Sequence, residues 1–410
     1  MRRIAWVLLL LFAFAIPWEF SLDLGEPLGN VARIAGLALL LVAVPAVLQA
    51  GRFRTPGLLQ WLVLALFLWF CCTYFWTIDP SATQTMMRAY FQEMAIVWLV
   101  WEFAESPQDL RALLRAFVAG SWVLALLTVA NIGSPEAIAA GQMRFAAVGQ
   151  DPNDVARFLD LGFPLAALLL TSESRSPWRL LALGYLPLGL VAVLLTASRG
   201  GFLAAIVAFA GSSLLLIRRN PRRAIAGAFA LPAAAGGLWL FLPHEIFERL
   251  ATIPGQIEGG DLNQRLNIWS AGWYAFLEAP FAGAGAGSFV TAAGLDPMDT
   301  AHNTALSILV SGGLCALFLA AGIVAAAVWA VVQTRGPLQL TLATMLAVWL
   351  VTSLVATVEE TRTTWLLLGL VALAGRLAFE NPERLAACFS AGAPRDDMEL
   401  AGGLERIPVH

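Results

Sequence analysis

The stretch that decides the fold runs from Asn303 to Val332 and reads NTALSILVSGGLCALFLAAGIVAAAVWAVV. None of its residues is charged. About 20 consecutive apolar residues are enough for a helix to cross a bilayer, and a helix in water needs a polar face that this stretch lacks. It therefore predicts a membrane-spanning helix that is long enough to tilt or to protrude.

The rest of the chain has the same character. Of its 410 residues 59% are hydrophobic and 13% charged, and the mean hydropathy is +0.75. Soluble domains are about half apolar and about a quarter charged, so this composition excludes a soluble protein. Further apolar stretches of spanning length lie at 4–20, 31–49, 57–76, 85–104, 109–131, 153–171, 178–197, 200–217, 224–242, 338–357 and 363–380. We expect an all-α integral membrane domain of about 12 transmembrane helices over residues 1–380, followed by a polar tail over 381–410.

The basic residues indicate the orientation. All 25 are Arg, and 17 of them fall in segments on the side of both predicted termini, against eight on the other side. Short cytoplasmic loops carry an excess of basic residues. Both termini are therefore predicted to be cytoplasmic, and the long segment 243–302, between the ninth and tenth spans, is predicted to be external.

This external segment contains a predicted amphipathic helix. Its apolar residues recur at spacings of three and four, which places them on one stripe: Leu262, Leu266, Trp269, Trp273 and Phe276. Arg265 lies at the edge of the stripe. We expect the helix to lie along the membrane surface or over the mouth of a cavity; a lid that only packs is the alternative.

Eight Arg residues remain on the external side, against the general tendency: Arg33, Arg88, Arg144, Arg157, Arg199, Arg249, Arg265 and Arg362. Arg near a membrane is costly unless it reaches the interface or finds a partner. One interpretation is pairing with acidic residues, for which the candidates are Glu19, Asp23, Glu26, Glu93, Asp160, Glu359 and Glu360. The other is a binding site for an anion such as a lipid-linked phosphate.

Arg199 has the most suggestive surroundings. It lies in Ser198-Arg199-Gly200-Gly201, where the eighth predicted span begins. The N-terminus of a helix offers free N–H groups and a positive dipole end, which suit a phosphate. A purely structural tight turn is the alternative.

His302 is the candidate general base. It lies in Asp299-Thr300-Ala301-His302-Asn303, just before the Asn303–Val332 span, which Asp299 or Thr300 is expected to cap. A positive helix end and nearby Arg would keep the pKa of the imidazole low, so that it can accept a proton. A capping or buried His is the alternative. The Gly-rich run 283–287 lacks the strand of a nucleotide loop and indicates a turn, and no metal-ligand spacing is present.

Three motifs follow in order: Ser198-Arg199-Gly200-Gly201; Arg265-Leu266-Asn267-Ile268-Trp269 with the run Pro280–Gly287; and His302-Asn303-Thr304 with Gly312-Gly313. Over about residues 195–315 this pattern resembles the O-antigen ligase family and its relatives, the Wzy-type polysaccharide polymerases and the protein O-oligosaccharyltransferases. Asp151-Pro152-Asn153-Asp154 also resembles a segment of these proteins.

The resemblance implies a GT-C-like glycosyltransferase of the bacterial inner membrane with its active site at the periplasmic face. The donor would be a glycan on undecaprenyl pyrophosphate, and the acceptor a lipid A-core sugar or another glycan. Neither a metal, a cofactor nor a nucleic acid is expected. Arg199 and Arg265 would bind the pyrophosphate, and His302 would activate the acceptor or hold the donor. Further substrate contacts are expected from Arg88, Arg144, Gly200, Trp269 and Asn303.

Three functions remain open at this point, with a non-catalytic scaffold as a fourth alternative. An O-antigen ligase transfers the glycan to lipid A-core, whereas a polymerase joins two lipid-linked glycans, and both need an anion site and an activated hydroxyl. A transporter would place its polar residues near the middle of the membrane, often in repeated broken helices. The polar residues here gather near one face, which favours the enzymes.

Overall fold

The computed structural model describes residues 1–25, 29–132, 144–173, 176–219, 242–260, 262, 264–297 and 299–390. Within these ranges every regular element is a helix, which confirms the predicted all-α fold. In chain order the helices are α1 (Arg2–Ala15), η1 (Ile16–Ser21), α2 (Val31–Ala50), α3 (Leu58–Cys72), η2 (Thr73–Phe75), α4 (Pro80–Phe103), α5 (Pro107–Ala130), α7 (Pro152–Ser172), α8 (Pro177–Leu195), α9 (Arg199–Arg219), α11 (His244–Ala251), α12 (Ile253–Glu258), α13 (Arg265–Glu278), α14 (Phe289–Ala293), α15 (Thr304–Gln333), α16 (Gly336–Ser353), α17 (Arg362–Glu380) and α18 (Pro382–Cys388).

Ten helical segments of the described chain are long and apolar enough to cross a membrane, and each coincides with a predicted span. They are α1 with η1, α2, α3 with η2, α5, α7, α8, α9, α15, α16 and α17. The predicted span 85–104 is met by α4, which is as long but carries Arg88, Glu93 and Glu102 and is not among the ten. Apart from Leu242, the predicted span 224–242 lies outside the described residues.

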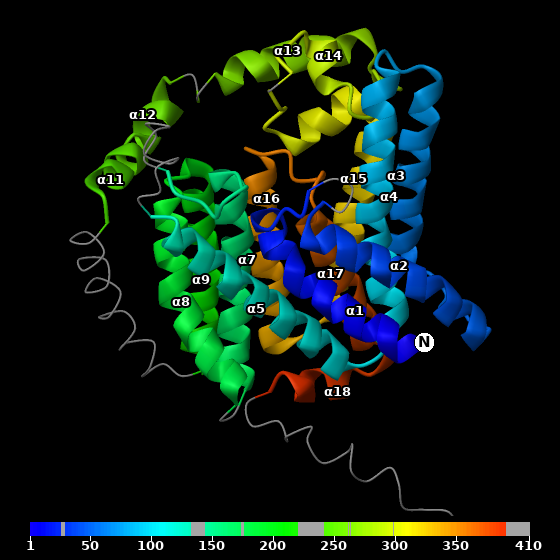
Figure 1. Cartoon of the computed structure of the whole chain (residues 1–410), viewed down its shortest axis with the longest axis vertical. Coiled ribbons are helices and arrows are strands. Elements are labelled where there is room, and N and C mark those ends of the chain that lie inside the picture. Colours follow the sequence, from blue (N-terminus) through cyan, green and yellow to red (C-terminus); the bar gives the residue numbers. More distant parts are fainter. Residues whose placement is uncertain are drawn as a thin grey trace, which may run out of the picture.

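Two helices form the centre of the bundle. α7 and α17 are buried along almost their whole length, whereas the other spanning helices leave large apolar side chains exposed on one face. Figure 1 shows α17 behind α1 and between α4 and α16, and α7 packs against α9 and α16, which also pack against each other. The exposed apolar faces around this centre match a chain whose solvent is lipid.

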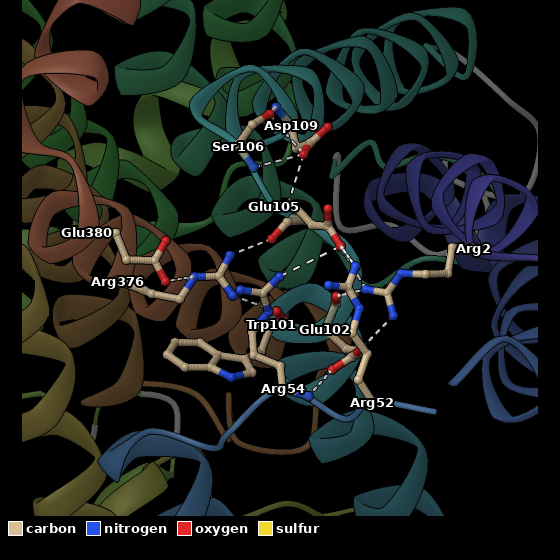
Figure 2. Close-up of polar contacts among 11 residues, drawn as sticks. Arg2, Arg52, Arg54, Trp101, Glu102, Glu105, Ser106, Asp109, Arg376 and Glu380 are labelled. Atoms are coloured by element: carbon tan, nitrogen blue, oxygen red, sulfur yellow. Dashed lines mark hydrogen bonds and ion pairs between the residues drawn. The ribbon is translucent and has the colours of Figure 1, made fainter. Parts of the chain in front are cut away.

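An ion-pair network ties the helices together at the end of the bundle that carries the N-terminus and α18. Figure 2 shows four guanidinium groups gathered around Glu102 and Glu105 at the end of α4; they belong to Arg2, Arg52, Arg54 and Arg376. Arg2 Nη1 donates to Glu102 Oε1 at 2.7 Å, and Arg376 donates to the carbonyl oxygens of Trp101 and Ala104. All four belong to the 17 predicted cytoplasmic Arg residues.

The polar tail begins with an ordered helix. Asn381 Oδ1 accepts a hydrogen bond from the Arg384 amide at the start of α18. Leu385, Cys388 and Phe389 are buried, and Cys388 Sγ donates to the carbonyl oxygen of Pro107. Residues 381–390 therefore belong to the packed bundle, and 391–410 lie outside the described residues.

The segment 243–302 forms a layer of short helices, α11 to α14, across the opposite end of the bundle (Figure 1). The predicted helix is α13, but its predicted stripe is wrong. Trp269 and Phe276 face the bundle, whereas Leu266 and Trp273 are exposed. The buried face is instead formed by Ile268, Gly272, Ala275 and Phe276. α13 is apolar on both faces, so spacing alone did not identify the inner one.

The Gly-rich run, which follows α13 in the chain, is hydrogen-bonded to the spanning helix α15. α15 breaks at Gly313, whose φ of 68° interrupts the helix, so that the amides of Leu314 and Cys315 lose their partners one turn back. Leu314 N donates instead to Pro280 O at 2.8 Å and Cys315 N to Phe281 O at 3.4 Å. The carbonyls set free, those of Val310 and Ser311, accept from the Ala284 and Gly285 amides. Gly283, Gly285 and Gly287 all have positive φ, as the tight path requires.

Candidate functional site

A cavity of about 240 Å³ lies between the layer of short helices and the bundle. Four Arg side chains converge on it, from four different segments: Arg144, Arg199, Arg249 and Arg265. The polar side chains of Asn153 and Gln256 also line it. The rest of the wall is apolar and consists of Leu203, Ile253, Leu262, Trp269 and Val355, with Gly200. Such a wall suits a ligand that carries negative charge next to an apolar part.

The N-termini of α7 and α9 form the floor. Asn153 Oδ1 accepts from Arg144 Nη2 at 2.9 Å and from Ser198 Oγ at 2.8 Å, and so links the two helix starts. Ser198 Oγ in turn accepts from the Gly201 amide at 3.1 Å and caps α9. A Cβ on Gly201 would collide with Ala156 of α7, so this glycine allows the two helices to approach. These hydrogen bonds and the close packing of the two helices hold Arg199 and Gly200 at the positive end of α9, where both line the cavity.

Arg249 reaches the cavity from α11. Ile246 of this helix belongs to a buried apolar cluster with Leu195, the last residue of α8, and with Ala197. Arg249 Nε donates to the carbonyl oxygen of Ala197 at 3.2 Å. The bond fixes the guanidinium beside the start of α9. The sequence placed Arg249 on the external side but gave it no motif, and it was not predicted as a site residue.

Helix α13 contributes two side chains to the cavity, those of Arg265 and Trp269. The inner face of this helix packs on Phe289 and Leu306, which sets its height above the bundle. Trp269 Nε1 donates to the carbonyl oxygen of Ala301 at 3.1 Å. The indole therefore lines the cavity and also holds the residue that precedes His302.

The four cations are close enough to influence one another. Arg144 has its pKa lowered to about 10, first by burial and then by the charges of Arg249, Arg265 and Arg199, with Asp151 opposing. Burial and Arg199 also lower the pKa of Arg249 and of Arg265. Among the described residues, no salt bridge joins Arg144, Arg249 or Arg265 to a carboxylate. An anion in the cavity would relieve this repulsion.

Residues with strained backbone conformations lie around the same cavity. The described non-glycine residues with positive φ are Ala197, Leu262, Gln264 and His302. Ala197 accepts from Arg249, Leu262 lines the cavity, and Gln264 directly precedes Arg265. Left-handed backbone at a non-glycine residue costs about 1–3 kcal/mol and clusters at functional sites. These positions therefore support the cavity as the site, independently of its charges.

His302 stands next to the cavity without lining it. Its Nδ1 lies 3.2 Å from Thr300 Oγ1, and burial followed by the charge of Arg265 lowers the pKa of the imidazole. Asp299 and Thr300 do not cap α15, contrary to the prediction. Asn303 does so, because its Oδ1 accepts from the Leu306 amide at 3.0 Å. Its Nδ2 donates to Leu354 O, which gives the side chain a structural role.

The eight external Arg residues separate into groups. Arg362 pairs with Glu19, one of the predicted acidic partners, whereas Arg157 pairs at 3.0 Å with Asp154, which was not predicted as a partner. Arg33 and Arg88 are exposed on α2 and α4, and Arg88 does not line the cavity. The remaining four converge there.

Residues 184–321 match the protein-family model described as O-Antigen ligase, over about a third of the chain. The chain carries an O-antigen ligase family domain. This ligase-family domain includes Arg199, Arg249, Arg265 and His302, and it ends within α15, beyond the break at Gly313. No curated protein matches the chain.

The ligase-family domain supports an O-antigen ligase or polymerase type of function, and members of the family are membrane glycosyltransferase-like enzymes. Together with the apolar helices, it indicates a multi-pass membrane protein, and the family implies glycan and lipid-linked substrates in general. Within the described ranges, no three His, Cys, Asp or Glu side chains come together as a metal site would require.

Proposed function

We propose that the chain is an O-antigen ligase of the bacterial inner membrane, GT-C-like in class. It would move a glycan from undecaprenyl pyrophosphate to a sugar hydroxyl of lipid A-core, at the periplasmic face. The observation that carries the proposal is the cavity in which four Arg side chains meet an apolar wall. The excess of Arg at the opposite end supports the orientation, because that end would be cytoplasmic.

The cavity suits a pyrophosphate for two reasons. Guanidinium groups bind phosphate oxygens in pairs, and Arg remains charged even where burial lowers its pKa to about 10. The start of α9 adds backbone amides and a positive dipole end. Leu203 and Val355 would contact the first apolar carbons of the lipid.

The transfer follows from this placement. The acceptor oxygen would attack the anomeric carbon from the face opposite the pyrophosphate, which inverts the configuration. As the new C–O bond forms, the bond to the phosphate oxygen breaks and its electron pair leaves with the pyrophosphate. The four preset guanidinium charges would stabilise this developing charge, in the manner that a metal does elsewhere. His302, uncharged at neutral pH because its pKa is lowered, would take the hydroxyl proton.

The test uses purified protein in detergent with an undecaprenyl-pyrophosphate glycan and rough lipopolysaccharide, with and without EDTA. The variants are Arg199→Ala, Arg249→Ala, Arg265→Ala and His302→Ala, with Arg88→Ala as an exposed Arg control. Glycan on the lipopolysaccharide that survives EDTA and falls by about 10²-fold or more in the site variants supports the proposal. Lengthening of the lipid-linked glycan instead would identify a polymerase. Full transfer in all four variants would refute the site.

A further inference from the structure

α13 is apolar on two opposite faces. Its inner face packs on α14 and α15 through Ile268, Ala275 and Phe276. Its outer face exposes Leu266, Trp273, Tyr274 and Leu277, which recur at helical spacing and are 47–67% exposed. Only the small Ser270 interrupts this face, and Asn267 and Glu278 lie at one edge of it. A helix that is apolar all round is normally buried all round.

The first helix of the same layer shows the opposite pattern. On α11 the apolar Ile246 faces inward, and the exposed side chains include His244, Glu245 and Glu248. This is the surface expected of a helix in water. The two helices belong to one segment of the chain. Because their exposed side chains differ in polarity, their outer faces are adapted to different surroundings.

The outer face of α13 continues into the lipid-facing surface of the bundle. Phe281 follows the helix, is 70% exposed, and lies at the break of α15, where its carbonyl accepts from Cys315. Leu314 and Phe318, which follow the break in α15, are also exposed. Trp76, which directly follows η2, donates its indole N–H to Ala282 O at 3.3 Å. Exposed apolar side chains of two spanning segments therefore lie next to the segment that follows α13.

We infer that the outer face of α13 is inserted into the lipid leaflet on its side of the membrane. The occupant of this face is lipid, because the face continues the surface of spanning helices and carries no charge. Trp273 and Tyr274 combine apolar rings with a polar group, the composition found at the membrane–water boundary. Figure 1 shows α13 running across the end of the bundle, as such a helix would lie.

Insertion sets the depth of the cavity. Arg265 and Trp269 project from the same helix toward the cavity. With the outer face among lipid chains and headgroups, the guanidinium of Arg265 stands near the level of the lipid phosphates. The anionic group of a membrane lipid would then enter the cavity at the same depth in the membrane as the lipid phosphates. This inference does not depend on the reaction proposed above.

The test places one fluorescent bimane label on each of three variants, Tyr274→Cys, Leu277→Cys and Glu248→Cys. The background replaces Cys71, Cys72, Cys315 and Cys388 with Ala. The full chain is reconstituted in phosphatidylcholine–phosphatidylglycerol vesicles, with nitroxides at the headgroup or along the acyl chain, or with iodide in the water. Unchanged melting temperature and monodispersity show that each variant is folded.

We expect nitroxide lipids to quench the Tyr274 and Leu277 labels several-fold more than the Glu248 label, most strongly from the headgroup and upper chain. Iodide should show the reverse order. Equal iodide quenching at all three positions would overturn the inference, because α13 would then lie in water. Protection of Tyr274 and Leu277 from both quenchers would also overturn it, since a protein partner, such as a second copy, would cover the face.

Discussion

The indole N–H of Trp269 donates a 3.1 Å hydrogen bond to the carbonyl oxygen of Ala301, the residue before His302. This bond connects the helix that supplies Arg265 to the turn that supplies the candidate base. Because His302 has a φ of 46°, the turn needs such restraints to persist. Trp269 is thereby a positioning residue as well as part of the cavity wall.

Trp269→Phe should slow transfer while leaving anion binding nearly intact. The ring still fills the wall, but the bond to Ala301 is lost, and a net hydrogen bond is worth about 1 kcal/mol, or about fivefold in rate. The measurement is kcat for glycan transfer alongside the Kd of inorganic pyrophosphate. Trp273→Phe is the control, because that indole is half exposed on the outer face. An equal effect of both substitutions would contradict a positioning role.

Inorganic pyrophosphate should raise the melting temperature of the purified protein, because it relieves repulsion among the four cations. Arg144→Gln and Arg249→Gln should each reduce this shift. Arg88→Gln removes an exposed Arg outside the cavity and should leave the shift unchanged. A thermal shift titration at fixed ionic strength separates this effect from general screening. Equal loss in all three variants would indicate nonspecific binding.

Transfer should fall on the acid side below pH 6.5. Burial and Arg265 lower the pKa of His302, so the imidazole is neutral at pH 7 and becomes protonated only as the pH falls through this lowered value. Arg265→Gln removes a nearby positive charge, so the pKa should rise and the acid limb of the rate profile should move to higher pH. Arg249→Gln is the matched control, since Arg249 is not among the charges that shift His302. An unmoved limb in Arg265→Gln would assign it to another group.

Glu102→Gln should destabilise the end of the bundle that carries the N-terminus without altering the cavity. Glu102 is almost buried and accepts from both Arg2 and the Arg54 amide, so loss of its charge removes the centre of the network in Figure 2. We expect a melting temperature lower by a few degrees, as for a loss of about 1–2 kcal/mol. Glu105→Gln, at a half-exposed side chain, should have less effect. Pyrophosphate affinity should be unchanged in both.

Sequence alone indicated much of the helical fold, because apolar length is a direct physical requirement of the bilayer. The starts of α5, α7 and α8 agree with it to within a few residues, at Pro107, Pro152 and Pro177. The sequence did not show which face of α13 is the inner one. Trp269 meets protein and Trp273 does not, and hydrophobicity does not distinguish a protein neighbour from a lipid neighbour.

The candidate site was indicated where a motif surrounded the residue. Arg199, Arg265 and Arg144, all predicted as site residues, line one cavity, and their roles toward a substrate stay predictions. Arg249 was missed because its neighbours on α11 carry no pattern, although its external position was a usable signal. Asn303 was expected to contact substrate, and its amide is engaged as a helix cap. Only tertiary contacts separate these roles.

The break in α15 makes the short-helix layer inseparable from the spanning bundle. Leu314 and Cys315 give their amides to the Pro280–Phe281 backbone, and the freed carbonyls accept from Ala284 and Gly285. Near lipid, each orphaned backbone group costs several kcal/mol. Residues 243–302 therefore cannot be exchanged as an independent unit. A chimera that carries a relative's segment in their place would leave backbone groups of the transmembrane helix α15 without hydrogen-bond partners. The exchange would also have to include residues 310–315.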